Sequence, residues 1–268
     1  MTGGWRPLLM SEWRKVTTTK MLWVLALIGI AYSCINTVTL TLLATDMFPG
    51  IPASEGGSML LDPAYITTLL AQVGTASTFV LILGIIAVTG EYRHMTITST
   101  FLSTPRRGRV LTAKMALYGG LGAIVALVTM AAVTVVLTLA LLSAGHAPIT
   151  ASSVTTVAIG ALIGFMLYAV LGVSLGALIR SQIAAIILAL VWVLLLEALV
   201  GLAFPSVAKW LPGGALNSVM DVSLEADMAG QFASADRLPA WGGVLVLLAY
   251  SVVLALLALR TTLRHDVT

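Results

Sequence analysis

The sequence predicts an all-α integral membrane protein with six transmembrane helices, on two observations. The chain of 268 residues is 59% hydrophobic and only 9% charged, whereas a soluble domain has about 25% charged residues. It also contains six apolar runs of roughly 20 residues or more, the length that a helix needs to cross about 30 Å of hydrocarbon. Backbone groups in lipid must be paired within their own segment, so these runs are expected to be helices.

The six runs form one predicted transmembrane domain over residues 1–268. The third and fourth runs exceed the minimum length, so they are expected to tilt or to project beyond the bilayer. The first run is not expected to be a cleavable signal, because it is too long and no small-x-small site follows it. The predicted spans are residues 21–43, 66–89, 115–142, 152–179, 183–204 and 241–259.

Positive charge gathers on one side of these spans. With spans alternating in direction, the side opposite the termini carries only Lys209 and Arg237 of the 14 Lys and Arg residues, beside seven carboxylates. Cytoplasmic connections are enriched in Lys and Arg, so both termini are predicted to be cytoplasmic. The basic residues on that side are Arg6, Arg14, Lys15, Lys20, Arg93, Arg106, Arg107, Arg109, Lys114, Arg180, Arg260 and Arg264.

Residues 5–20, before the first span, have the pattern of a short amphipathic helix. Pro7 suits the first turn of a helix, and Leu9, Trp13 and Val16 follow at helical spacing. Such a helix is expected to lie along the inner leaflet, with its basic residues facing anionic lipid. The alternative is a first span that simply extends further and carries a positive flank.

Residues 91–109, between the second and third spans, contain more local structural features than the positive charge that sets topology requires. A helix from about residue 91 is expected to stop near residue 102, because the residue before Pro105 disfavours the helical region, and a cluster of arginines follows. The alternative is plain positive-inside anchoring. The helix, the proline turn and the arginines together favour a docking surface for another protein, made by Glu91, Tyr92, Arg93, His94, Thr104, Pro105, Arg106, Arg107 and Arg109.

The fourth span carries glycines at four-residue spacing, namely Gly160, Gly164, Gly172 and Gly176. Small residues at this spacing let two helix backbones approach closely in lipid. The pattern therefore predicts helix packing. It leaves open whether the neighbouring helix belongs to the same chain or to a second copy.

Glu197 is a carboxyl group inside the fifth span. A charged acid near the bilayer centre costs on the order of 3 kcal/mol on insertion scales, so such groups usually face a cavity or a partner. One interpretation places Glu197 on a substrate path or in an outer gate. The other makes it a hydrogen-bonded carboxyl that fixes helix packing.

Residues 205–240, before the last span, are too long for a simple turn and too apolar to be fully solvated. We expect one or two short helices that re-enter the outer leaflet, with a break at residues 212–214. They would either gate an outer exit or form a surface helix without a gating role.

The sequence lacks the common motifs of nucleotide-binding and hydrolytic sites. It has no G-x-x-x-x-G-K-[ST] phosphate loop, so the chain is not expected to bind or hydrolyse ATP, and it has no G-x-S-x-G element. His94, His146 and His265 lie far apart in the sequence, and Cys34 is the single cysteine. No catalytic, cofactor-binding or metal-binding residue is predicted, and nucleic acid is not an expected partner.

Several stretches resemble the membrane permease subunit of type-2 ABC exporters. EYRHMTITSTFLSTPRRGRVLTAK is similar to the segment of that family which contacts the ATP-binding subunit. SEWRKVTTTK resembles its interfacial elbow helix and WLPGGALN its outer re-entrant region, while the ending RHDVT is similar to the tails of actinobacterial members.

This resemblance implies a dimeric permease, paired with two separate ATPase subunits that bind ATP and Mg, in a bacterial plasma membrane. Glu91, Arg93 and His94 would begin the coupling helix, and residues 104–107 would form its exit turn. Glu197 falls where many relatives carry an acid followed by proline, but here Ala198 follows it.

The expected function is therefore outward transport of a substrate, driven by a partner ATPase. One alternative is an ion-coupled secondary transporter acting alone, for which Glu197 is the one ionisable residue that the spans offer. The other is a membrane anchor or sensor subunit that transports nothing.

Overall fold

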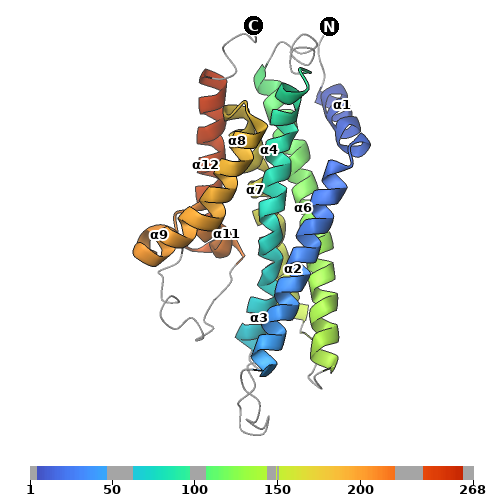
Figure 1. Ribbon diagram of the computed structural model, residues 1–268, viewed down its shortest axis with the longest axis vertical. Coiled ribbons are helices and arrows are strands. Elements are labelled where there is room, and N and C mark those ends of the chain that lie inside the picture. The colour runs from blue at the N-terminus through green and yellow to red at the C-terminus, as the bar shows by residue number, and fades with distance from the viewer. Residues whose placement is uncertain are drawn as a thin grey trace.

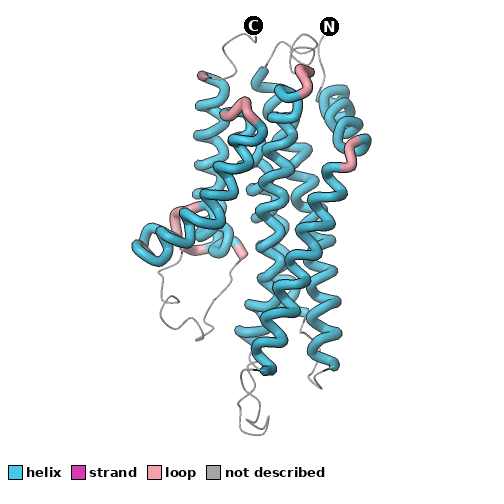
Figure 2. Tube along the Cα trace, in the orientation of Figure 1, coloured by secondary structure: helices cyan, strands magenta, loops and turns pink. Residues whose placement is uncertain are grey.

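A computed structural model describes residues 5–46, 63–96, 107–143, 149, 151–220 and 238–261 of the chain. Within these ranges the structure is helical and contains no strand (Figure 2). Six helices are long and apolar enough to cross a membrane, as the sequence predicts. The chain is a multi-pass membrane protein.

The spans correspond closely to the apolar runs. The first is α2 and the second combines α3, η3 and α4. The third and fourth are α6 and α7, the fifth combines α8, η4 and α9, and the sixth is α12. The bounds are α1 Trp5–Thr18, α2 Met21–Asp46, α3 Pro63–Leu70, η3 Ala71–Ala76, α4 Ser77–Arg93, α6 Arg107–Ser143, α7 Ala151–Leu178, α8 Gln182–Leu190, η4 Val191–Leu196, α9 Glu197–Ala203, α10 Pro205–Ala208, α11 Pro212–Val219 and α12 Ala240–Arg260.

The helix α7 lies at the centre of the bundle and contacts α4, α6 and α12 (Figure 1). The most apolar windows of the second and fourth spans are each 61% buried, whereas that of the fifth span is only 11% buried. The fifth span tilts away from the bundle in Figure 1, with its α9 end furthest out. Most of its apolar surface is therefore free to face lipid or another chain.

Close contact between α4 and α7 depends on glycines from both helices. A Cβ atom added at Gly172 would lie 2.2 Å from the carbonyl oxygen of Leu81, and one at Gly176 would lie 2.6 Å from that of Ile85. From the other side, a Cβ atom at Gly84 would lie 2.4 Å from the carbonyl oxygen of Ala169. Two of the four patterned glycines of the fourth span thus pack against a helix of the same chain.

The other two patterned glycines, Gly160 and Gly164, face α11. A Cβ atom at Gly160 would lie 2.6 Å from the Cα atom of Met220, and one at Gly164 would lie 2.4 Å from the Cδ1 atom of Leu216. Gly160 lies about 14 Å inside the Ala151 end of α7, at 1.5 Å per residue. The short helix α11 therefore sits alongside the bundle, well inside one end of its central helix.

Two spans depart from α-helical geometry without a proline. The second span contains the 3-10 segment η3, and the fifth contains the π-helical segment η4 directly before Glu197. Such segments release backbone groups from the regular ladder. Next to η3, the hydroxyl of Ser33 in α2 lies 2.9 Å from that of Thr75 and 3.4 Å from the carbonyl oxygen of Val73, so a polar contact joins the first two spans at this point.

The inner connection differs from its prediction at both ends. Glu91 does not begin a separate helix, because α4 runs through it to Arg93 and ends in a turn where Met95 has φ 55°. The helix that contains the third span begins before the predicted start of that span at residue 115, because α6 already begins at Arg107. Both helices continue into polar sequence beyond the apolar run that marks the span. The expected helix end near residue 102 lies outside the described residues.

Candidate functional site

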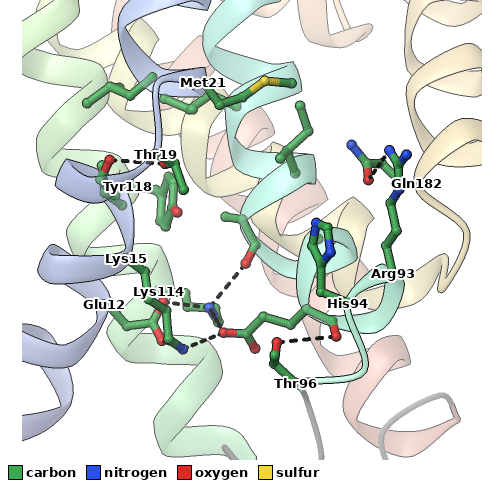
Figure 3. Close-up of a pocket in the computed structure, with 17 residues that line it drawn as sticks. Glu12, Lys15, Thr19, Met21, Arg93, His94, Thr96, Lys114, Tyr118 and Gln182 are labelled. Carbon is green, nitrogen blue, oxygen red and sulfur yellow. Dashed lines mark hydrogen bonds and ion pairs between the residues drawn. The ribbon is translucent and has the colours of Figure 1, made fainter.

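Four charged side chains from three helices meet at the end of the bundle where the termini lie (Figures 1 and 3). The Lys114 Nζ atom of α6 lies 2.5 Å from Glu12 Oε2 of α1 and 2.9 Å from Glu91 Oε1 of α4. The Lys15 Nζ atom of α1 lies 2.7 Å from Glu12 Oε1 and 2.6 Å from Glu91 Oε1. We call this set of four residues the inner ion cluster.

Three members of the inner ion cluster are almost completely removed from solvent. Glu12 is 3% exposed, Glu91 7% and Lys114 2%. Lys114 also donates to the carbonyl oxygen of Ala87 over 3.1 Å, so its three donors all have acceptors. Buried charges are tolerated only when paired in this way, and removing one partner strands the others. The cluster therefore ties α1, α4 and α6 to one another.

The electrostatics of α1 follow from this pairing. Burial by itself would raise the pKa of the Glu12 carboxyl group, but the nearby ammonium groups of Lys114 and Lys15 outweigh it and lower the pKa from its ordinary value of 4.5. Burial would lower the pKa of Lys15, but hydrogen bonds to Glu12 and Glu91 raise it above 10.5. Both groups are charged at neutral pH.

The inner ion cluster forms part of the wall of a pocket of about 480 Å³. Figure 3 shows Glu12, Lys15 and Lys114 of the cluster on one side of the pocket and Arg93, His94 and Gln182 on the other. Drug-sized ligands occupy pockets of about 300–1,000 Å³, so this one is large enough to hold a small molecule or part of a lipid. Its lining residues are Glu12, Lys15, Val16, Thr19, Met21, Leu22, Leu83, Ile86, Ala87, Gly90, Glu91, Arg93, His94, Thr96, Lys114, Tyr118 and Gln182.

The predicted docking residues that the structure describes lie around this pocket and at the start of α6. Arg93 and His94 are exposed, and Arg93 Nη1 donates to Gln182 Oε1 over 3.5 Å. Tyr92 is half-buried. Arg107 and Arg109 occupy the first turn of α6. Thr104, Pro105 and Arg106 lie outside the described residues.

Glu197 lies apart from the inner ion cluster, in the fifth span. Its Oε2 atom accepts a hydrogen bond of 2.8 Å from the backbone N–H of Gly213, 16 residues further along the chain. Gly213 is in the first turn of α11, where backbone N–H groups have no partner within the helix. A Cβ atom at Gly213 would lie 2.0 Å from Glu197 Oε2, so only glycine allows this approach. Glu197 joins the fifth span to α11.

The sequence pattern predicts only a topology role for Lys15 and Lys114 and does not distinguish Glu12 from other polar residues. A signal was present for Lys114, which follows buried Val110 and precedes buried Tyr118 at four-residue spacing, on the stripe of α6 that faces the bundle. Glu12 likewise precedes the buried Val16 by four residues. Trp13, expected on the same face as Val16, is 46% exposed, because the face of α1 that packs contains Glu12 instead.

Within the described residues, no group of three His, Cys, Asp or Glu side chains is placed to hold a metal ion. Comparison with known proteins found no family model that matches the chain and no matching curated protein.

Proposed function

We propose that this chain is the permease subunit of an ATP-driven exporter in a bacterial plasma membrane. It would act as a homodimer with two ATPase subunits, which bind ATP and Mg, and would move substrate outward. The observation that carries this proposal is the inner ion cluster. It joins α1, α4 and α6 at the point where α4 enters the basic connection 91–109, the segment on which a partner subunit would act.

The cluster gives the proposed docking segment a firm attachment to the bundle. Glu91 lies two residues before the end of α4, and Lys114 holds it together with Glu12. A force on the segment therefore moves α1, α4 and α6 together. Because α4 packs on α7 through Gly84, Gly172 and Gly176, the displacement reaches the central helix. Rigid-body movement of this kind is a common way to switch between two states.

The half of the bundle away from the inner ion cluster supplies a candidate for the exit. There α11 packs against α7 and α12, and the backbone N–H of Gly213 in α11 is hydrogen-bonded to Glu197 of the fifth span. A displacement of α7 would change how these elements cover that half. We propose that α11 closes the exit in one state and opens it in the other.

The test is co-purification with candidate ATPase subunits, followed by ATPase assays in nanodiscs. A stable complex is expected, in which the permease stimulates hydrolysis and the double substitution Arg106→Glu with Arg107→Glu abolishes the stimulation. Arg260→Glu is the matched control, because Arg260 is an exposed arginine at the end of α12, outside the connection. Stimulation that survives the double substitution contradicts the coupling role.

Solute flux in proteoliposomes separates the remaining alternatives. Flux by the chain alone along an ion gradient would replace this proposal with a secondary transporter. A stable ATPase complex without any flux would leave a membrane anchor or sensor.

A further inference from the structure

The pocket beside the inner ion cluster has two chemically different walls. Its polar wall contains Lys15, Arg93 and His94, all of them exposed. Its apolar wall contains Leu22 and Leu83, together with Ile86 and Ala87. From residue 83 to residue 93, α4 rises by about 15 Å, at 1.5 Å per residue. The pocket therefore passes along α4 from hydrocarbon-like surroundings to polar ones.

The charged side chains of this pocket leave an excess of positive charge for a ligand. Glu12 and Glu91 are buried and are balanced by Lys15 and Lys114, so the excess comes from Arg93. The exposed charged or basic side chains of the lining are those of Lys15, Arg93 and His94. An anionic group would thus meet basic residues at the polar end.

One buried acceptor of the pocket wall is left over. The Oε2 atom of Glu91 is inaccessible to solvent and has no hydrogen-bond partner among the described residues. A buried acceptor without a donor costs about 1–3 kcal/mol. Glu91 lines the pocket, so a ligand that displaces the side chains covering this oxygen, and that has a hydroxyl group next to its anionic group, would supply the missing donor.

We propose that this pocket binds an anionic phospholipid with a hydroxylated headgroup. The phosphate lies against Arg93, His94 and Lys15, a headgroup hydroxyl donates to Glu91 Oε2, and an acyl chain follows Leu22, Leu83 and Ile86. The membrane supplies this ligand, because the helices that form the pocket cross the bilayer. Lipid binding at this site requires neither transport nor an ATPase partner.

The first experiment fills the pocket. A Cβ atom at Gly90 would have only Ile86 Cγ2 within 4 Å, at 3.9 Å, so Gly90→Leu places its side chain in the pocket without a backbone clash. Gly120→Leu is the matched control, because Gly120 is exposed on α6 and a Cβ atom there would have no neighbour within 4 Å. Binding of phosphatidylglycerol and of phosphatidylcholine with the same acyl chains is titrated by native mass spectrometry.

The wild-type chain is expected to bind one phosphatidylglycerol more tightly than any phosphatidylcholine. Gly90→Leu should lose this site and Gly120→Leu should keep it. Equal affinity of the wild type for the two lipids would overturn the proposal, as would a preference that Gly90→Leu leaves intact. Displacement of the lipid by inorganic phosphate alone would also overturn it, because the pocket would then be an aqueous anion site.

A second variant tests the polar wall without filling the pocket. Arg93→Gln should weaken phosphatidylglycerol binding by about fivefold, because one basic residue near the membrane surface strengthens binding to anionic lipid by about that factor. Phosphatidylcholine binding should change less. Arg260→Gln, which removes an exposed arginine at the end of α12, should leave both affinities unchanged. If both arginine variants weakened phosphatidylglycerol binding equally, the loss would reflect the net charge of the protein alone. That result would overturn the proposed site.

Discussion

Lys114 contacts both carboxylates of the inner ion cluster while being almost completely buried. A lone ammonium group in this position would be very unfavourable, and so would either carboxylate without a cation nearby. The buried charges are tolerated only while all of them are present. Replacing one member should therefore lower the stability of the protein by more than the loss of a surface ion pair would.

The first prediction concerns removal of this ammonium group. Lys114→Met keeps much of the side-chain volume but strands Glu12 and Glu91, so we expect a loss of about 3–5 kcal/mol of stability. Thermal unfolding in detergent micelles measures it. The triple variant Lys114→Met, Glu12→Gln, Glu91→Gln should recover part of the loss. A single variant as stable as the wild type would show that the cluster does not hold the three helices together.

The second prediction concerns pH. Because folding lowers the pKa of Glu12, its contribution to stability is fully present above about pH 4.5 and is lost as the pH falls through the lowered value. Because folding raises the pKa of Lys15, its contribution is present below about pH 10.5 and is lost as the pH rises through the raised value. Unfolding temperatures of the wild type and of Glu12→Gln, measured from neutral to acid pH, test this. The wild type should lose more stability on the acid side, and parallel profiles would contradict the assignment.

Among the elements, the fifth span contributes least to the core and depends most on single contacts. Only 11% of its apolar window is buried, against 61% for the second and fourth spans. The π-helical segment η4 ends directly before Glu197, so the helix is irregular where its acid lies. The hydrogen bond from Gly213 to Glu197 therefore has a large share in placing α9 relative to α11.

The third prediction distinguishes the two interpretations of Glu197. Glu197→Gln keeps an oxygen that accepts from Gly213 N–H, so stability should be close to that of the wild type. Glu197→Leu leaves that N–H without its acceptor and should cost about 1–3 kcal/mol. Thermal unfolding in micelles checks both variants. A glutamine variant that folds normally but loses transport would instead give the carboxylate charge a role on the substrate path.

The elements were predictable to different degrees. Hydropathy alone locates all six spans, because each must satisfy its backbone and bury itself in lipid. It does not show where α4 and α6 end, since both extend into polar sequence. The glycine spacing predicts close packing, but the partners of Gly160 and Gly172, on α11 and α4, follow only from the tertiary arrangement. For the same reason the sequence did not show that Glu12, Glu91 and Lys114 meet, since they come from three different helices.

At the scale of the whole molecule, both ends of the described chain lie at the same end of the bundle (Figure 1). The helix α1, which contributes Glu12 and Lys15 to the inner ion cluster and to the adjoining pocket, also lies there. Twelve of the 14 Lys and Arg residues belong to this side if the spans alternate in direction. Positive charge resists translocation and remains cytoplasmic. The docking role and an inner-leaflet position for the pocket both require this orientation.

The fourth prediction tests the orientation with single cysteines. Cys34 is the only natural cysteine, so Cys34→Ala gives a background without thiols. Met95 is 78% exposed in the turn after α4, and Glu55 belongs to the connection that the sequence predicts outside. A membrane-impermeant maleimide should label Glu55→Cys in intact cells but label Met95→Cys only after lysis. The reverse pattern would place the basic connection outside the cell, away from ATP, and would remove the physical basis for an ATPase partner.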